Sequence, residues 1–213
     1  MSEIKISILE ENQNFSKFEI SENFICIRFL DHNKERFELE FNLEKGTSFN
    51  TFLIRNNEEL FIIYPPEKQY LNSFNEIISN FFNQYKLNKI NVISGHINPQ
   101  IIETIKNVSK RFQDLTITCS NPGFKLISEL WNQRNPNLDN FVEIKFPEVN
   151  IIKKELNLEL DNISLELIPI PTARWPGGLI IYERNQEILL SEKIFSAHTV
   201  SYTHLTLPTI LRV

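Results

Sequence analysis

The sequence predicts an α/β fold in which two strand-rich regions flank a central stretch of alternating strands and helices. Three observations support this prediction. Residues 25–65 contain short apolar or alternating runs, residues 68–132 contain apolar residues spaced by three and four between short strands, and residues 163–191 return to strands. This order is typical of a layered α/β sandwich. Periodicity alone does not separate that architecture from several other α/β folds.

The first strand-rich region is typical of two hairpins. Residues 25–30 (ICIRFL) and 36–43 (RFELEFNL) flank the polar turn DHNKE, and the second of these runs alternates apolar and polar residues. Residues 49–54 (FNTFLI) and 59–65 (ELFIIYP) form the second candidate, which ends at Pro65–Pro66. The sequence therefore predicts two antiparallel pairs before the first helix.

The central region alternates helices with short buried strands. Apolar residues recur at helical spacing from about Lys68 to Tyr85, which predicts an amphipathic helix. A second helix is expected from Pro99 to Arg111, since proline suits the first helical turn. The remaining expected elements are strands at 90–94 and 115–119, a helix that begins after Asn121–Pro122 and runs to about Asn132, and strands at 163–170, 178–183 and 187–191.

Composition excludes several classes of protein. Hydrophobic residues make up 41% and charged residues 23%, as in ordinary globular domains, and the net charge of −5 without a Lys/Arg run argues against a nucleic-acid partner. No apolar stretch approaches the length of a membrane span, and the acidic N-terminus is not a secretory signal. Cys26 and Cys119 lie in apolar segments and are expected to be buried free thiols. A cytoplasmic location is the default expectation.

The C-terminal segment is expected to be foreign to the protein. Residues 200–209 resemble the translation of a transposase-type sequencing adaptor, and the last four residues resemble index sequence beyond it. The predicted organisation is a partial domain at residues 1–198 and a non-native tail at residues 199–213, with the native sequence stopping near His198.

Five blocks in order resemble the metallo-β-lactamase-like domain of the cyanobacterial A-type diflavin flavodiiron proteins. They cover residues 46 to 198 and read GTSFNTFLI, ISGHINPQI, ITCSNPG, LELIPIPTARWPGGLIIYE and LLSEKIFSAH. Residues 1–45 contribute little to the resemblance. The resemblance implies a metallo-β-lactamase-like αββα sandwich that is C-terminally incomplete.

This sequence departs from the family at the metal-ligand positions. The family's loop His-x-Glu-x-Asp-His aligns with His96, Asn98, Gln100 and Ile101, so only the first histidine remains. Arg174, before Trp175–Pro176, stands where the family carries a later histidine, and Lys193 stands where it carries a bridging aspartate. One of these six positions therefore keeps a metal ligand.

Charge predicts that these positions hold no metal. A di-iron site needs imidazole nitrogens and carboxylate oxygens, whereas arginine has no lone pair to give. A positive charge ~4 Å from another costs about 4 kcal/mol at an effective dielectric of ~20, and a divalent ion doubles that cost. We expect no catalytic residue and no di-iron centre here. The structural interpretation of His96 is a hydrogen-bonded loop residue. For Arg174, the structural interpretations are stacking on Trp175 or pairing with a carboxylate such as Glu192.

Three functions remain open at this point. The first is a fragment of a diflavin flavoprotein that reduces dioxygen to water, inactive alone, whose FMN would lie in the full-length protein. In it this domain would be a structural partner in a homo- or hetero-oligomer with a flavodiiron paralogue. The second is a metal-dependent hydrolase of the same fold, which the ligand losses oppose. The third is a non-enzymatic module that binds an anion through Arg174 and Lys193.

Overall fold

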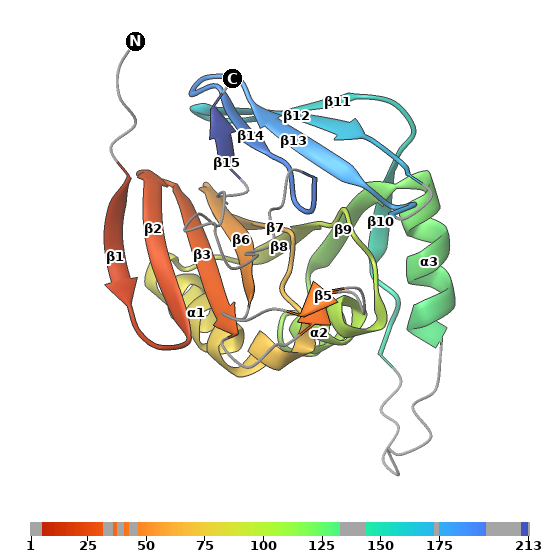
Figure 1. Ribbon diagram of the computed structural model, residues 1–213, viewed down its shortest axis with the longest axis horizontal. Coiled ribbons are helices and arrows are strands. Elements are labelled where there is room, and N and C mark those ends of the chain that lie inside the picture. The colour runs from red at the N-terminus through yellow and green to blue at the C-terminus, as the bar shows by residue number, and fades with distance from the viewer. Residues whose placement is uncertain are drawn as a thin grey trace.

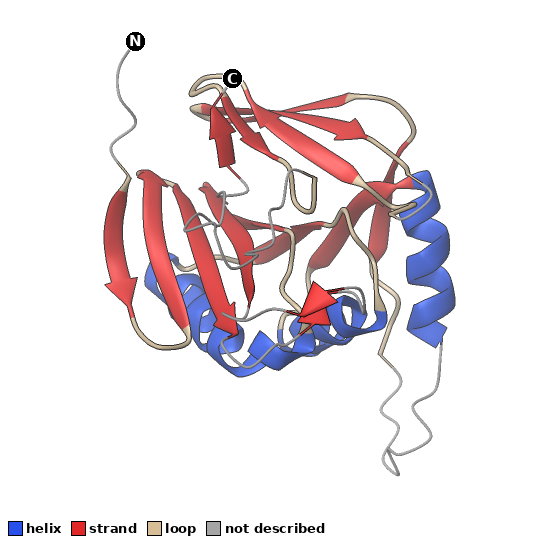
Figure 2. Ribbon diagram, in the orientation of Figure 1, coloured by secondary structure: helices blue, strands red, loops and turns tan. Residues whose placement is uncertain are grey.

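Two stacked β-sheets with helices on one side form the observed architecture (Figure 1), in a computed structural model that describes residues 6–31, 36–37, 41–42, 47–132, 144–172, 175–194 and 210–212. The large sheet has the strand order β1-β2-β3-β6-β7-β8-β9-β10, and the small sheet has the order β11-β12-β13-β14-β15. Within the described residues, the helices cover the outer face of the large sheet, and the small sheet packs on its other face (Figure 2). The predicted αββα-type sandwich is confirmed, with its second helical layer not represented among the described residues.

The elements of the large sheet and its helices follow the chain from Ser7 to Ile152. They are β1 Ser7–Glu11, β2 Phe15–Ser21, β3 Phe24–Asp31, β6 Thr47–Asn56, β7 Glu59–Ile63, η1 Lys68–Tyr70, α1 Leu71–Tyr85, β8 Lys89–Ile93, α2 Pro99–Arg111, β9 Leu115–Ser120, α3 Asn121–Asn132 and β10 Glu148–Ile152. The strands β7, β8, β9 and β10 run parallel to one another, which is why a helix connects each of the first three to the next.

The small sheet is antiparallel throughout. Its strands are β11 Leu156–Leu160, β12 Ile163–Pro169, β13 Leu179–Glu183, β14 Ile188–Leu190 and β15 Ile210–Arg212. The strand β15 pairs with β14 and falls within residues 199–213, the segment that the sequence predicts to be a tail. A separate two-stranded ladder joins β4 Arg36–Phe37 to β5 Phe41–Asn42.

One predicted pairing is wrong. The sequence predicts a hairpin between residues 25–30 and 36–43, but β3 pairs antiparallel with β2 on one side and with β6 on the other. Arg36–Phe37 pairs instead with Phe41–Asn42 in the separate ladder. The physical reason is continuity of burial: β2 and β6 extend the apolar surface of β3, with eight register pairs between β3 and β6. The second predicted hairpin, β6 with β7, is confirmed.

Alternation along the central strands creates two separate cores. On β3, Ile25 and Ile27 face the helices, whereas Phe24 and Cys26 face the small sheet. The helix side is filled by apolar residues at helical spacing, including Phe74 and Ile78 of α1, both fully buried. Both cysteines are buried free thiols, as predicted, and burial raises the pKa of each to about 12. No helix in the described part of the chain is long and apolar enough to cross a membrane.

Candidate functional site

The positions that resemble the family's metal loop lie at the carboxyl end of β8. The strand continues through Ile93 into the loop 94–98, where the backbone N–H of Ser94 still donates to Thr118 O of β9 at 3.0 Å. The residues that follow β14, Ser191–Ile194, come to the same end of the sandwich, since the Glu192 side chain contacts this loop. The fold therefore brings the 96–101 block and the 189–194 block together, as the resemblance implies.

Two of the positions that the resemblance aligns with metal ligands serve the scaffold. Asn98 is the N-cap of α2, and its side-chain oxygen accepts a hydrogen bond from the Ile101 backbone N–H at 2.8 Å. The Asn98 amide nitrogen donates to Glu67 Oε1 at 3.3 Å. Ile101 is 1% exposed and belongs to the core beneath the large sheet, while Gln100 is exposed at the start of the helix. These positions begin a helix and fill a core.

Of the three remaining positions, the structure describes two, His96 and Lys193. His96 is partly exposed, and its backbone N–H is held by Glu192. Lys193 lines a small cavity of about 10 Å³ together with Glu192 and Trp175. Arg174 lies outside the described residues. A cavity of this size holds one water molecule at most.

Glu192 is the residue whose importance the sequence did not reveal. Both of its carboxylate oxygens accept from the His96 backbone N–H, at 2.8 and 2.9 Å, and its Oε2 occupies the space that a Cβ on Gly95 would need. Desolvation raises the pKa of this carboxyl to about 7, while the His96 N–H and the charge of Lys193 act in the opposite direction. Glu192 also has a φ of 52°, which is unusual for a residue with a side chain. The feature of the sequence that could have indicated this contact is Gly95, because a Cβ at that position would overlap the Glu192 carboxylate.

Close packing of three glycines shapes the same end of the sandwich. A Cβ on Gly177 would lie 2.8 Å from Gly95 O and 3.2 Å from the Cα of Gly123. The Ser120 hydroxyl donates to Gly177 O at 3.0 Å and accepts from the Gly123 N–H at 3.2 Å. The Gly178 N–H donates to Trp175 O at 3.0 Å and closes a tight turn at Trp175–Gly178. Backbone, not side chains, fills the space between these loops.

Tyr64 ties the two sheets together beside this region. It follows β7, is 1% exposed, and has a φ of 56°. Its hydroxyl lies 2.8 Å from Leu179 O and 2.9 Å from Leu190 O, at the ends of β13 and β14. Burial raises the pKa of this phenol well above its usual value, and the nearby charge of Glu192 acts in the same direction.

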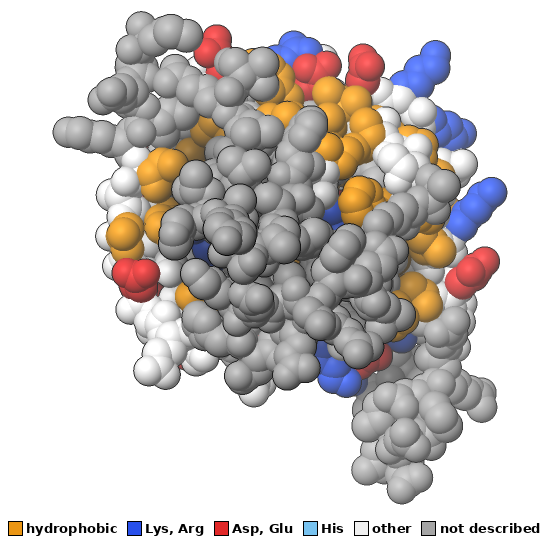
Figure 3. Space-filling model, viewed as in Figure 1, with side chains coloured by type: hydrophobic (Ala, Val, Ile, Leu, Met, Phe, Trp, Pro, Cys, Tyr) orange, Lys and Arg blue, Asp and Glu red, His pale blue; other side chains and the backbone are white. Residues whose placement is uncertain are grey.

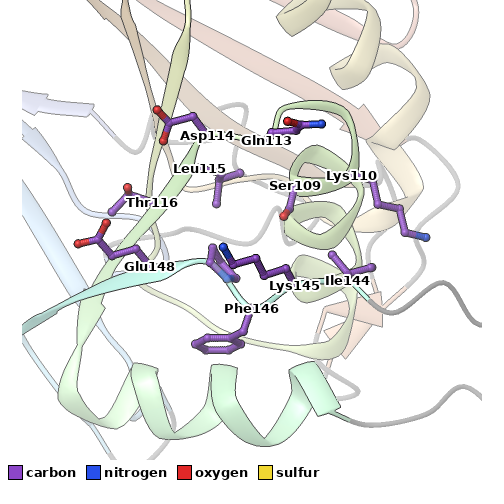
Figure 4. A pocket seen from close by; sticks show the side chains of 11 residues that line it. Ser109, Lys110, Gln113, Asp114, Leu115, Thr116, Ile144, Lys145, Phe146 and Glu148 are labelled. Carbon is purple, nitrogen blue, oxygen red and sulfur yellow. The ribbon is translucent and has the colours of Figure 1, made fainter.

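No group of three or more His, Cys, Asp and Glu side chains that is suited to a metal ion occurs within the described ranges. A larger cleft of about 600 Å³ lies elsewhere, where the end of α2 and the start of β9 meet residues 144–148 (Figure 4). Its wall carries Lys110, Lys145, Asp114 and Glu148, so charges of both signs line it. Lysine, arginine and acidic side chains are scattered around the visible face of the molecule (Figure 3).

Comparisons with known proteins identify the family. Residues 47–209 match the model of the "ODP family beta lactamase". A putative diflavin flavoprotein A 6 of Nostoc sp. is 32% identical over 181 residues, and a putative diflavin flavoprotein A 5 of the same organism is 31% identical over 179 residues. Each alignment covers 84% of this chain and 29% of the relative, so the chain spans less than a third of the length of these relatives.

Solved structures agree with this assignment. The metal-soaked Flv1 flavodiiron core from Synechocystis sp. superposes with a TM-score of 0.74 at 26% identity, over 89% of this chain and 44% of that one. The diflavin flavoprotein A 5 fragment 1–254 from Nostoc sp. gives a TM-score of 0.70 at 29% identity, over 87% of this chain and 68% of that one. This chain belongs to the ODP β-lactamase family, as a flavodiiron-type domain matching those of the cyanobacterial A-type diflavin flavoproteins.

Proposed function

We propose that this chain is the β-lactamase-like domain of a diflavin flavoprotein that takes part in reducing dioxygen to water, and that the domain itself carries no di-iron centre. In this proposal it acts as a structural partner for a metal-bearing paralogue in a cytoplasmic hetero-oligomer. Electrons would come from a reduced nicotinamide or a ferredoxin-type donor through FMN bound outside residues 1–198. The diflavin relatives, of which the chain covers 29%, support the placement of the flavin in the remaining sequence.

The observation that carries the proposal is the use made of the former ligand positions. The side-chain oxygen of Asn98 accepts the N-cap hydrogen bond of α2, and Ile101 is buried in the core, so neither position supplies a ligand. Lys193 adds a positive charge beside Glu192, whose carboxylate contacts the loop at His96. Among the described residues, the positions aligned with metal ligands carry no carboxylate to balance two cations, so they do not fit a pair of iron ions.

Metal analysis tests the proposal. The protein is purified after expression in iron- and zinc-supplemented medium, and its metal content is measured by elemental mass spectrometry. A metal-bearing flavodiiron protein prepared in parallel serves as the control. We expect less than about 0.1 iron or zinc per chain against about two per chain in the control. Iron or zinc near one equivalent or more would refute the proposal.

The partner role requires a second measurement. The protein is co-expressed with a metal-bearing paralogue from the same genome, and co-purification is followed together with oxygen consumption by the reduced flavoprotein. We expect a stable mixed oligomer whose oxygen consumption depends on the ligands of the paralogue. Oxygen reduction at the same rate by the protein alone, with flavin but without the paralogue, would contradict this role.

A further inference from the structure

We propose that the backbone N–H of His96 and its surroundings form a binding nook for a small carboxylate, and that Glu192 is its built-in occupant. The nook is bounded by Gly95, His96 and Lys193, and the Glu192 carboxylate lies in it. This inference concerns the same end of the fold as the proposed function and rests on it only in that a resident metal would compete for this space. In this inference, the carboxylate bound at the His96 N–H is the side chain of Glu192 and not an ion from solution.

The contacts of Glu192 match those of a bound anion. Both oxygens accept from one N–H, at 2.8 and 2.9 Å, so the donor points between the two carboxylate oxygens. Lys193 follows Glu192 in the chain and lines the same small cavity. Gly95 leaves the approach open, because a Cβ there would overlap Glu192 Oε2. A donor, a cation and a glycine therefore converge on one carboxylate.

The backbone of Glu192 shows that this placement has a cost. Its φ of 52° lies in the left-handed region, where a residue with a Cβ is disfavoured relative to glycine. Placing the carboxyl against the Gly95 backbone also removes part of its surface from water, which costs free energy. Two unfavourable contributions are offset at one residue, which is expected when its side chain has a specific contact to make. The remaining cavity of about 10 Å³ leaves no room for a second anion beside it.

The consequence is that external anions do not bind to the native protein at this position. An acetate or similar ion would meet the charge of Glu192 in the space that it needs. Removing the Glu192 side chain should vacate a space of the size and chemistry of a short carboxylic acid. The variant Glu192→Gly is the best perturbation, since glycine also removes the left-handed strain.

The test is hydrogen exchange of the loop in the presence and absence of sodium acetate. Amide exchange of the peptide containing residues 93–99 is measured by mass spectrometry in wild type, Glu192→Gly and Glu192→Gln. We expect Glu192→Gly to exchange the His96 amide at least tenfold faster, and 100 mM acetate to restore most of the protection. Acetamide, which is neutral, should not restore it, and wild type should not respond to acetate. Glu192→Gln should keep the amide protected, because its side-chain oxygen still accepts.

A matched control is available in the turn between β13 and β14. Glu187 also has a positive φ, of 58°, and is exposed, so Glu187→Gly makes the same chemical change away from the nook. Its loop exchange should equal that of wild type with and without acetate. Unchanged exchange in Glu192→Gly would overturn the inference, as would equal rescue by acetamide or no rescue by acetate. If Glu192→Gly does not fold, the decision rests on Glu192→Gln, which should protect the His96 amide equally with and without acetate. Protection of that amide only in the presence of acetate would overturn the inference, because it would show that the side chain at position 192 does not fill the nook. Metal found in wild type would instead refute the proposed function.

Discussion

Replacing Tyr64 by phenylalanine should destabilise the protein, because it removes a buried hydrogen bond between the two sheets. The Tyr64 hydroxyl sits 2.8 Å from Leu179 O and 2.9 Å from Leu190 O, and the residue is 1% exposed. One O–H donates to one carbonyl at a time, so the variant removes one donor and leaves two buried acceptors facing a ring edge. Leaving a buried polar group unsatisfied costs about 1–3 kcal/mol. We expect the free energy of unfolding to fall by about 2 kcal/mol.

The measurement is urea-induced unfolding followed by circular dichroism, with the midpoint and the slope fitted separately. Tyr85→Phe is the control, because Tyr85 is 36% exposed and keeps its ring beneath the Arg55 guanidinium. Its effect should stay within about 0.5 kcal/mol. A Tyr64→Phe variant no less stable than Tyr85→Phe would refute the view that this hydroxyl joins the sheets.

Three further predictions concern residues near the candidate site and in the small sheet. Asn98→Ala should destabilise the protein by about 1 kcal/mol through loss of the α2 N-cap, while the exposed neighbour Gln100→Ala should change little, both measured by thermal unfolding. Glu183→Gln should cost about 1–3 kcal/mol in the same assay, because the buried carboxylate accepts from the backbone N–H groups of three residues and an amide has one acceptor oxygen; equal stability would contradict this. The pKa of Glu192 is raised from 4.5 to about 7, so the folded state holds a proton that the unfolded chain has released, and the free energy of unfolding should fall by up to about 3 kcal/mol as pH rises from about 4.5 to 7. This decline should be absent in Glu192→Gln, and a wild-type stability that rises over that range would contradict the assignment.

Local patterns determined most of the secondary structure. Helical spacing predicted α2 with its observed limits and α1 with its observed end, because the buried face of an amphipathic helix is visible in its own sequence. The predicted start of the first helix at about Lys68 was too early, since residues 68–70 form the separate short helix η1. The β6–β7 hairpin was equally local, since its strands are separated by a short turn at Asn57–Glu58. The partner of β3 was not local. Residues 36–43 alternate as a strand does, yet β2 and β6 pair with β3 because they complete its apolar surface on both sides.

The candidate site divides in the same way. The sequence by itself was enough to predict that Asn98, Gln100 and Ile101 stand where the family has metal ligands, since residue identity is enough to count donors. In the segment that follows β14, the sequence led us to align Lys193 with a metal ligand, and Glu192 was considered only as a candidate partner of Arg174. Only the tertiary structure decided that Glu192 lies against the His96 loop, because that contact joins residues 96 positions apart and depends on a left-handed backbone and a glycine that permits close approach. Donor chemistry is a property of single residues, whereas which carboxylate reaches the N–H of a distant loop depends on how the two loops pack.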